Sequence, residues 1–376
     1  MLPDFRLEVH FSRWEFTARH NLAASDAESV RMRELLALAD DADRAAWHDL
    51  RLGYTETIGS PGLREAIAAT YDRVDSSEVL CFTGAQEGIF CAMHALLEPD
   101  DPAVVLVPNY QSLEEIPLSI CEVTGVGLRE REGWALDLDE VQAALRPDTR
   151  LIAVNFPNNP TGAMVDEATW TALVELASSR GIHLFSDEVY RGLERDPGAA
   201  LPQAADLHED ASSLGVMSKA YGLAGLRVGW IACRNRDILA RMERVKHYLS
   251  ICGPAPSELL ARIALKARDR VLERNRRLTA ANLARLLEFF DRHPALFDWY
   301  IPDGGCIMYP RYLGGAGVED FCRSAVEEAG VLLLPASVYR SRLLPVPDDR
   351  FRVGFGRATF TEGLTALERH LTAARV

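Results

Sequence analysis

Four short runs of apolar, mainly β-branched residues constrain the fold of this chain most. They cover residues 79–82, 104–107, 151–154 and 183–186, and stretches with helical periodicity lie between them. Near-continuous apolar runs of this length are typical of strands that helices cover on both faces. The alternation therefore predicts an α/β fold, in which a large domain holds a mostly parallel sheet covered by helices on both faces. A smaller α/β C-terminal domain is expected beside it.

The stretches between and after these runs carry helix signals. One helical face is formed by four apolar residues at i, i+3, i+4 and i+7, namely Trp170, Leu173, Val174 and Ala177. Gly181 follows, and we expect it to end this helix because glycine readily adopts the left-handed conformation found after helix ends. A longer helical stretch, with interruptions, is predicted from Ser257, a candidate N-cap, to about residue 293.

The length of the chain, 376 residues, is sufficient for two domains. We predict an N-terminal arm at residues 1–49 that belongs to the small domain, and a large domain at residues 50–290. The small C-terminal domain is predicted at residues 291–376.

Composition and charge narrow the classes of partner. The formal net charge is −14, from 41 basic and 55 acidic residues, which argues against a nucleic-acid partner. No apolar stretch approaches the roughly 20 residues needed to cross a bilayer, and the N-terminus lacks the pattern of a signal peptide. The seven scattered cysteines contain no C-x-x-C pair. We therefore expect seven small buried hydrophobic residues in a reducing cytoplasm, with neither disulfides nor a metal site.

Five short segments, in one order along the chain, carry most of the chemical information. They are Gly84-Ala85-Gln86, residues 155–162 (NFPNNPTG), residues 186–190 (SDEVY), Ser218-Lys219 and residues 225–229 (GLRVG). The first segment follows a predicted strand and opens a helical pattern, so its backbone N–H groups are expected to bind an anion. Each segment alone has an ordinary structural interpretation, as a turn, a helix cap or a solvated lysine.

Together, the five segments resemble those of fold-type-I enzymes that use pyridoxal 5′-phosphate (PLP), specifically the class I/II aminotransferase family. The similarity extends over about residues 50–360. It implies a PLP cofactor that Lys219 holds as an internal aldimine. It also implies a PLP-dependent transferase, an aminotransferase that acts on an amino acid and a 2-keto acid through a quinonoid. Lys219 would serve as general base and acid at the substrate Cα.

The resemblance assigns further groups around the cofactor ring. Asp187 would keep the pyridine nitrogen protonated, because a nearby carboxylate favours the cation. Asn159 and Tyr190 would donate hydrogen bonds to the phenolic oxygen. Tyr110 would stack on the ring, although an ordinary core position is the alternative for this residue.

The phosphate of the cofactor would be bound by Gly84, Ala85 and Gln86 at the start of the predicted helix. Ser218 and Arg227 match the hydroxyl and the guanidinium that bind the phosphate in the family. In the loop between them, Gly222 and Gly225 are expected to allow a close approach of the backbone. Tyr54 matches a tyrosine that reaches the phosphate of the neighbouring subunit, which implies a homodimer with shared active sites.

Near the C-terminus, Arg352 is the candidate for binding the substrate α-carboxylate by two hydrogen bonds. Strand alternation places it on one face with Gly354 and Gly356, and we expect the two glycines to leave room there for a ligand. The same alternation directs Arg357 away from the site. A surface salt bridge is the alternative role for Arg352.

The N-terminal segment departs from the family pattern, because residues 21–28 lack the glycine and proline that are usual there. Residues 11–16 are faintly similar to the arm of PLP enzymes that act on arginine, such as capreomycidine synthases and arginine oxidases. We therefore expect Glu15 and Asp26, together with Glu28, near the substrate side chain, with solvated carboxylates as the alternative. The alternative function is a PLP-dependent cyclase, oxidase or hydroxylase of an arginine-like amino acid in secondary metabolism.

A non-enzymatic alternative is a transcription regulator that carries an aminotransferase-like domain. Such a protein needs a DNA-binding segment before this domain, and the first 50 residues are too short and too acidic for one. The expected partners are accordingly a small amino acid and a keto acid, with no nucleic acid and no membrane.

Overall fold

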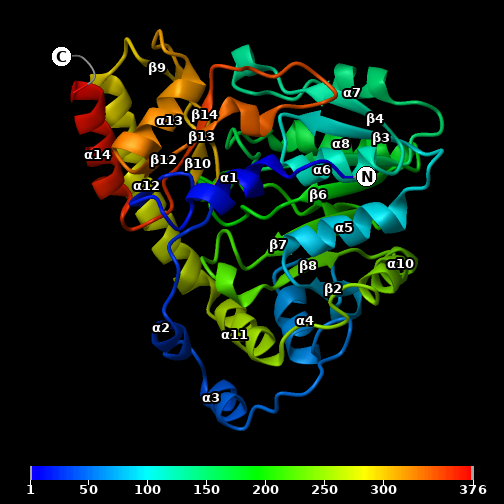
Figure 1. The fold of residues 1–376 in the computed structure, drawn as a ribbon. Helices are drawn as coiled ribbons and strands as arrows, with labels where there is room; N and C mark the ends of the chain where they lie inside the picture. The colour runs from blue at the N-terminus through cyan, green and yellow to red at the C-terminus, as the bar shows by residue number, and fades with distance from the viewer. Residues whose placement is uncertain (1, 374–376) are drawn as a thin grey trace.

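The structure, a computed structural model, describes residues 2–373 of the chain. Its centre is a seven-stranded sheet with the order β2-β8-β7-β6-β5-β3-β4 (Figure 1). The strands are β2 (Val79–Phe82), β3 (Pro102–Val107), β4 (Glu122–Gly127), β5 (Leu151–Asn155), β6 (His183–Asp187), β7 (Ala211–Val216) and β8 (Gly229–Ala232). Strand β8 is antiparallel to both of its neighbours, whereas every other neighbouring pair is parallel. The predicted α/β fold with a mostly parallel sheet is therefore confirmed.

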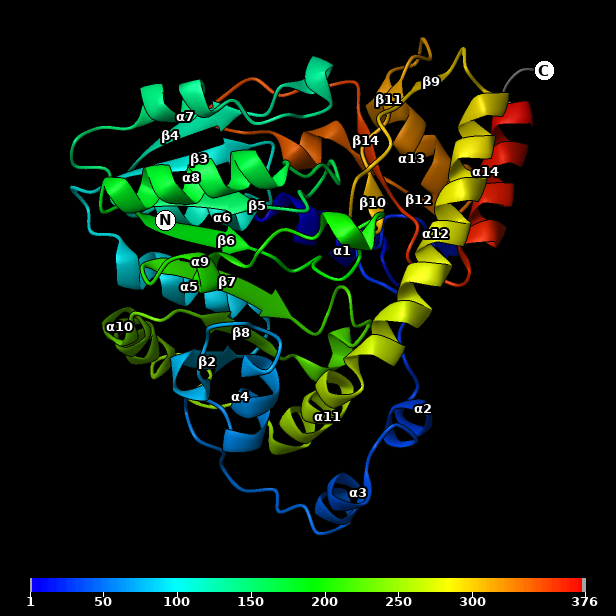
Figure 2. The ribbon, with the colours of Figure 1, turned by 180° about the vertical axis from the view of Figure 1, so that it is seen from behind.

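Helices cover both faces of this sheet, as its apolar strands predict. On one face α5 (Ala85–Leu96), α6 (Gln111–Leu118) and α10 (Arg236–Lys246) pack against side chains such as Val105 and Ala153. On the other face α7 (Leu138–Ala144), α8 (Glu167–Ser179) and α9 (Ala204–Leu207) pack against side chains such as Val104 and Ile152. Near β2 and β8, α4 (Pro61–Ala68) and α11 (Ala255–Lys266) continue this layer, as Figure 2 shows from behind. Successive strand residues thus face opposite layers.

Helix α8 begins and ends as local signals dictate. The Asp166 side chain accepts a hydrogen bond from the Thr169 N–H at 2.7 Å, and Gly181 has a φ of +65° just beyond the helix. The predicted N-cap at Ser257 is wrong, because α11 begins at Ala255 without a side-chain cap. Pro256 is tolerated in this first turn since a proline there forfeits no intrahelical hydrogen bond. The expected interruption separates α11 from the long helix α12 (Arg268–Arg292).

The C-terminal part is built from short strands and two further helices, α13 (Val318–Glu328) and α14 (Phe360–Ala373). Strands β10 (Ile307–Met308), β14 (Phe351–Gly354) and β13 (Leu334–Pro335) form an antiparallel sheet in that order. Strand β9 (Phe297–Asp298) pairs with β11 (Arg311–Tyr312). The remaining short strand, β1 (His20–Asn21), pairs in parallel with β12 (Val331–Leu332), so the N-terminal region adds to this part.

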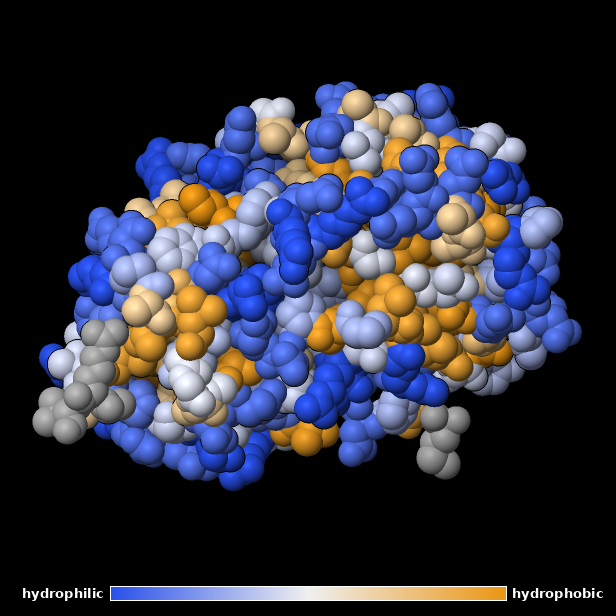
Figure 3. Space-filling model, turned by 90° about the horizontal axis from the view of Figure 1, so that it is seen from above, coloured by the Kyte–Doolittle hydropathy of each residue, from blue (hydrophilic) through white to orange (hydrophobic). Residues whose placement is uncertain are grey.

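The first 50 residues otherwise form α1 (Arg6–Trp14), α2 (Met32–Leu36) and α3 (Asp41–His48). The predicted domain boundaries stay predictions, and their outermost residues, Met1 and residues 374–376, lie outside the described residues. Viewed from above, hydrophilic residues occupy much of the surface, with apolar residues between them (Figure 3). Within residues 2–373, no helix is long and apolar enough to cross a membrane.

The cysteines only partly follow the prediction. All seven are free thiols, and Cys81, Cys91, Cys233, Cys306 and Cys322 are buried. Cys121 and Cys252 are only half-buried, so the expectation of a buried position is wrong for these two. Both lie in connections at the surface, Cys121 just before β4 at the edge of the sheet and Cys252 between α10 and α11.

Candidate active site

The polar residues of three predicted segments meet at the carboxyl ends of neighbouring strands in the large sheet. Asn155 and Asp187 end the neighbouring strands β5 and β6 and face each other in register. The chain leaves β7 at Val216 and reaches Lys219 three residues later. Because the carboxyl ends of parallel strands lie on the same side of the sheet, the sheet itself brings these residues together.

Lys219 lies at the centre of this group. Its Nζ donates a hydrogen bond to the Ser25 hydroxyl at 2.8 Å and lies 6.0 Å from the centroid of the Tyr190 ring. Burial lowers the pKa of Lys219, while the charge of Asp26 acts in the opposite direction. A larger fraction of this amine is therefore neutral at neutral pH, as a nucleophilic lysine requires.

Asp187 is a buried carboxylate in an environment that disfavours its charge. Only 3% of the residue is exposed, and the backbone N–H of Val189 donates to it at 3.2 Å. Burial raises the pKa of Asp187 to about 7, although the hydrogen bond from Val189 and the charge of Lys219 oppose this shift. A cation placed beside this carboxylate would restore its ionised form.

The segment around Gly84 forms an open helix start. Helix α5 has no side-chain cap, and Gly84 adopts a φ of +88° that favours glycine. A side chain at Gly84 would collide with the guanidinium of Arg227, and a Cβ at Gly229 would lie 2.8 Å from the Ala85 nitrogen. Arg227 itself has a φ of +53° and approaches the Ser218 hydroxyl to 3.5 Å. Backbone N–H groups, a hydroxyl and a guanidinium therefore converge at one point.

Arg352 is fully buried and connects the C-terminal part with the sheet edge. Its Nη1 donates to Asn159 Oδ1 at 3.1 Å and to the Tyr339 hydroxyl at 2.6 Å, and its Nη2 donates to the Ala23 carbonyl at 2.7 Å. Its Nε is buried without a hydrogen-bond partner within residues 2–373. An unpaired buried donor is costly, so this guanidinium has the capacity to bind a further acceptor such as a carboxylate.

Comparisons with known proteins agree with this geometry. The sequence profile of the family described as aminotransferase class I and II matches residues 21–367. This chain belongs to that family. Capreomycidine synthase from Streptomyces vinaceus is 31% identical over 381 residues, which cover 98% of this chain and 94% of the relative.

Two solved structures resemble this family member over nearly its whole length. A PLP-dependent aminotransferase from Streptococcus suis has a TM-score of 0.91 and 30% identity, over 99% of this chain and 98% of that chain. A PLP-dependent cyclase has a TM-score of 0.89 and 26% identity, over 100% of this chain and 98% of that chain. The inferred PLP-dependent transferase with the fold of the type-I aminotransferases is thereby confirmed, and PLP is its cofactor.

The residues of this aminotransferase family member fit PLP. The uncapped start of α5 with Arg227 and Ser218 suits a phosphate dianion, since helix N-termini and guanidinium groups favour such anions. The raised pKa of Asp187 reflects a buried carboxylate that a protonated pyridine nitrogen would neutralise. The lowered pKa of Lys219 suits an amine that reacts with an aldehyde.

The expectation that Gly354 and Gly356 leave room for a ligand is wrong. Backbone from residues 22–28, which we call the crossing segment, fills that space. The Gly354 N–H donates to the Leu22 carbonyl at 2.6 Å, and a Cβ at Gly354 would collide with the carbonyl of Ala24. A Cβ at Gly356 would collide with the carbonyl of Asp26 in the same way. The glycines therefore admit another part of the chain.

The crossing segment also places Asp26 and Arg357 in the site. Both carboxylate oxygens of Asp26 accept hydrogen bonds from Arg357 Nη2, at 2.9 and 2.7 Å, and Asp26 is 8% exposed. The expectation that Arg357 points away is wrong, because β14 ends at Gly354 and strand alternation no longer applies beyond it. The carboxylate of Glu28 instead accepts a hydrogen bond from the Ala358 N–H at 2.7 Å.

Glu15 lies in the same electrostatic environment as Asp26. It follows α1 directly and is half-buried. Burial, followed by repulsion from Glu8 and Asp26, raises the pKa of Glu15. Glu15 therefore lies close enough to Asp26 and Lys219 for their charges to act on it.

The two glycines of the loop between Ser218 and Arg227 have different surroundings. Gly222 has a φ of +66°, and a Cβ there would collide with the Glu28 carbonyl. At Gly225, by contrast, nothing within the described residues lies within 4 Å of a Cβ, so the close approach expected there stays a prediction. The side chain of Gln86 accepts a hydrogen bond from Ser112 at 2.7 Å, which leaves its backbone as part of the helix start.

The predicted tyrosines occupy three different environments. Tyr190 is buried beneath Lys219, with 1% of the residue exposed. Tyr110 precedes α6 and its ring lies 5.4 Å from that of Phe5. Tyr54 is 93% exposed, so it makes little contact with its own subunit. Its assignment to the neighbouring subunit stays a prediction.

Three residues of the site were not predicted as part of it, namely Ser25, Tyr339 and Arg357. Ser25 lies in the segment that departs from the family pattern, which was the one signal available for it. Tyr339 lies 13 residues before Arg352 and has no motif of its own.

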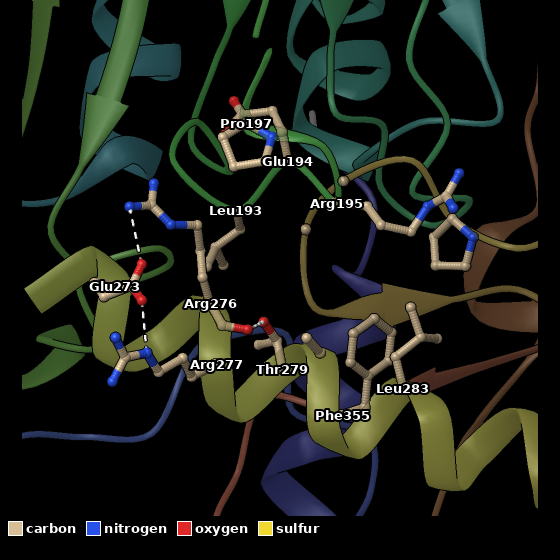
Figure 4. Close-up of a pocket in the computed structure, with 14 residues that line it drawn as sticks. Leu193, Glu194, Arg195, Pro197, Glu273, Arg276, Arg277, Thr279, Leu283 and Phe355 are labelled. Atoms are coloured by element: carbon tan, nitrogen blue, oxygen red, sulfur yellow. Dashed lines mark hydrogen bonds and ion pairs between the residues drawn. The ribbon is translucent and has the colours of Figure 1, made fainter. Parts of the chain in front are cut away.

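A separate cavity of about 240 Å³ lies between the loop after β6, α12 and Phe355 (Figure 4). None of the predicted site residues lines it. Arg276 and Arg277 at its edge both pair with Glu273, at 3.6 and 2.6 Å, so their charges are already compensated. Among the described residues, no group of acidic, histidine or cysteine side chains could hold a metal ion.

Proposed function

We propose that this chain transfers an amino group between an amino acid and a 2-keto acid. The observation that carries the proposal is the buried guanidinium of Arg352 with its unpaired Nε, linked through Asn159 to the strand ends that carry Lys219 and Asp187. An α-carboxylate is common to amino acids and 2-keto acids, so one clamp would serve both substrates.

When bound, PLP supplies the electron sink that makes the substrate Cα acidic. Lys219 would take the proton from Cα as general base and return a proton as general acid, since its lowered pKa favours the neutral amine. Asp187 would hold a proton on the pyridine nitrogen. Asn159 and Tyr190 would orient the cofactor through its phenolic oxygen, and Tyr110 would stack on the ring.

The phosphate would be held by the backbone of Gly84, Ala85 and Gln86, together with Ser218 and Arg227. Tyr54 would reach the phosphate of a second copy, which makes the proposed working unit a homodimer with shared sites. The exposure of Tyr54 supports this arrangement. We also propose that the protein acts in the cytoplasm.

A second candidate is the cyclisation, oxidation or hydroxylation of an arginine-like amino acid. The observation that favours it is the half-buried carboxylate of Glu15 close to Asp26. Burial and the neighbouring acidic charges disfavour the charged form of Glu15, and a cationic side chain would stabilise it. The similarity to a capreomycidine synthase and to a PLP-dependent cyclase supports the same candidate.

The experiment that tests the proposal is an absorbance scan of the PLP-loaded protein during addition of single amino acids. A transaminase loses the PLP absorbance with donors such as glutamate or alanine, and a 2-keto acid restores it. A change that appears with arginine alone, and that no keto acid reverses, would replace transamination by the second candidate. No PLP uptake by the purified protein would refute both.

A further inference from the structure

The hydroxyl of Tyr339 lies between Asn159 and Arg352, two residues of the proposed site that belong to different sequence motifs. It accepts a hydrogen bond from Arg352 Nη1 at 2.6 Å and donates one to Asn159 Oδ1 at 3.1 Å. Arg352 Nη1 also donates directly to Asn159 Oδ1 at 3.1 Å. All three residues are buried, with at most 5% of each exposed. They form a closed triangle of hydrogen bonds that is largely shielded from solvent.

The chemistry of the donors determines how this triangle is oriented. A guanidinium has only donors, so the amide atom of Asn159 that faces Arg352 must be its oxygen. The Tyr339 oxygen accepts from Arg352, and its single proton therefore points to the same amide oxygen. The amide NH₂ of Asn159 is left on the other side, free to donate elsewhere.

The backbone connects the same amide to the strand ends. The Asn159 N–H donates to Asn155 Oδ1 at 2.7 Å, and Asn155 Nδ2 donates to the Asp187 carbonyl at 2.9 Å. Asn159 is thus held from the sheet by its backbone and from the C-terminal part by its side chain.

We infer that Tyr339 is a positioning residue, whose hydroxyl holds Arg352 for the substrate carboxylate and turns the Asn159 amide NH₂ toward the cofactor. The inference rests on the proposed function, which gives Arg352 and Asn159 these roles. It adds a residue that links the binding of the carboxylate to the hydrogen bonding of the cofactor.

The N-terminal arm supports the position of Tyr339. Tyr339 ends a short 3₁₀ turn, Ala336–Tyr339, and Arg6 of α1 donates to the carbonyls on either side of it. The distance from Arg6 Nε to the Val338 carbonyl is 3.3 Å. Burial also raises the pKa of Tyr339 to about 12, so the hydroxyl keeps its proton at neutral pH.

The test is the Tyr339→Phe variant, which keeps the ring and removes only the hydroxyl. Tyr309→Phe is a matched control, because its ring lies 5.5 Å from that of Tyr339, the residue is also buried, and its hydroxyl has no partner within residues 2–373. Propionate serves as a carboxylate probe, and its binding is read from the absorbance of bound PLP.

We expect Tyr339→Phe to weaken propionate binding and to raise KM by about tenfold, as the loss of one charge-assisted hydrogen bond implies. We expect kcat to change less. The pH midpoint of the PLP absorbance change should rise, because a less well oriented Asn159 stabilises the negative phenolic oxygen less. Tyr309→Phe should leave all of these values unchanged.

An unchanged propionate affinity and an unchanged pH midpoint in Tyr339→Phe overturn the inference, as does an equal effect of Tyr309→Phe. The Arg352→Gln variant separates this failure from that of the proposed function. If Arg352→Gln loses propionate affinity and Tyr339→Phe does not, only the inference fails. If neither loses it, the role of Arg352 in the proposed function fails, and the inference fails with it.

Discussion

The strand ends and the crossing segment build the same site in different ways. At the strand ends, Asn155, Asp187 and Lys219 are brought together by the register of one parallel sheet. The crossing segment, residues 22–28, reaches the site from the other end of the chain and uses both backbone and side-chain atoms. The Ala23 carbonyl, for example, accepts from Arg352, which lies 329 residues away.

The two regions therefore have different roles: the strand ends supply the catalytic groups, and the crossing segment positions them. The residues at the strand ends carry the groups that PLP chemistry needs, and each lies within a recognisable motif. The crossing segment contacts the cations of the site through Ala23, Ser25 and Asp26. Changes at the strand ends should therefore abolish the chemistry, whereas changes in the crossing segment should shift the binding and stability of the site.

The largest effect is expected from Lys219→Ala. Removal of the amine eliminates the general base at the substrate Cα, and we expect kcat to fall by about 10⁴-fold or more. Steady-state kinetics check this, with PLP content measured in parallel. Ser25→Ala, which removes the hydroxyl that accepts from Lys219 and also lies beside Tyr190, is the control and should retain most of the activity. Turnover of Lys219→Ala at the wild-type rate would show that the strand ends do not supply the catalytic base.

Asp187→Asn should change the pH dependence of stability. Burial raises the pKa of Asp187 to about 7, so the folded apoprotein keeps a proton that the unfolded chain has lost above about pH 4. The folded protein then binds more protons than the unfolded chain, and its stability falls as pH rises through this window. The variant lacks this loss, so its stability relative to wild type should increase by up to about 4 kcal/mol between pH 4 and pH 7.

Denaturant unfolding of both apoproteins across this pH range measures the difference. With PLP bound, the order should reverse, because the pyridinium would stabilise the charged carboxylate of the wild type only. A constant stability difference at all pH values would mean that Asp187 is ionised in the folded apoprotein.

Gly354→Ala tests whether the crossing segment is closely packed on β14. A Cβ at this position would collide with the Ala24 carbonyl, so the segment must move or the strand must distort. We expect a loss of about 3 kcal/mol in the free energy of unfolding, in the range typical of overpacked sites. Gly315→Ala is the control, since nothing within the described residues lies within 4 Å of its Cβ. Equal stability of the two variants would show that the crossing segment yields without cost.

The contrast also explains what the sequence could predict. The apolar runs of β2, β3, β5 and β6 and the residues next to them were predicted correctly, because a buried strand and its following loop are encoded locally. The space beside Gly354 and the direction of Arg357 were predicted wrongly. Both depend on where β14 ends and on what crosses it. Tyr339 contacts Asn159 across 180 residues, so no local pattern could indicate it.

The smallest effect is expected from Asp26→Asn, which breaks the pair with Arg357 but keeps the shape of the side chain. The charge of Asp26 opposes the lowering of the Lys219 pKa, so the pKa of Lys219 should fall further in the variant. The pH dependence of Lys219 acylation in the apoprotein, read by mass spectrometry, should shift to lower pH. The free energy of unfolding should fall by about 1–2 kcal/mol, as for a partly buried charged hydrogen bond.

Asp41→Asn is the matched control, because its pair with Arg44 is exposed to solvent and such pairs contribute little. If Asp26→Asn leaves the acylation profile of Lys219 unchanged, Asp26 acts only on Arg357, and the crossing segment positions the site without tuning its lysine. A shift of the profile with little loss of stability would mean the reverse. The charge of the crossing segment would then tune the reactivity of Lys219. The two regions would differ in how they reach the site, and not in whether they take part in its chemistry.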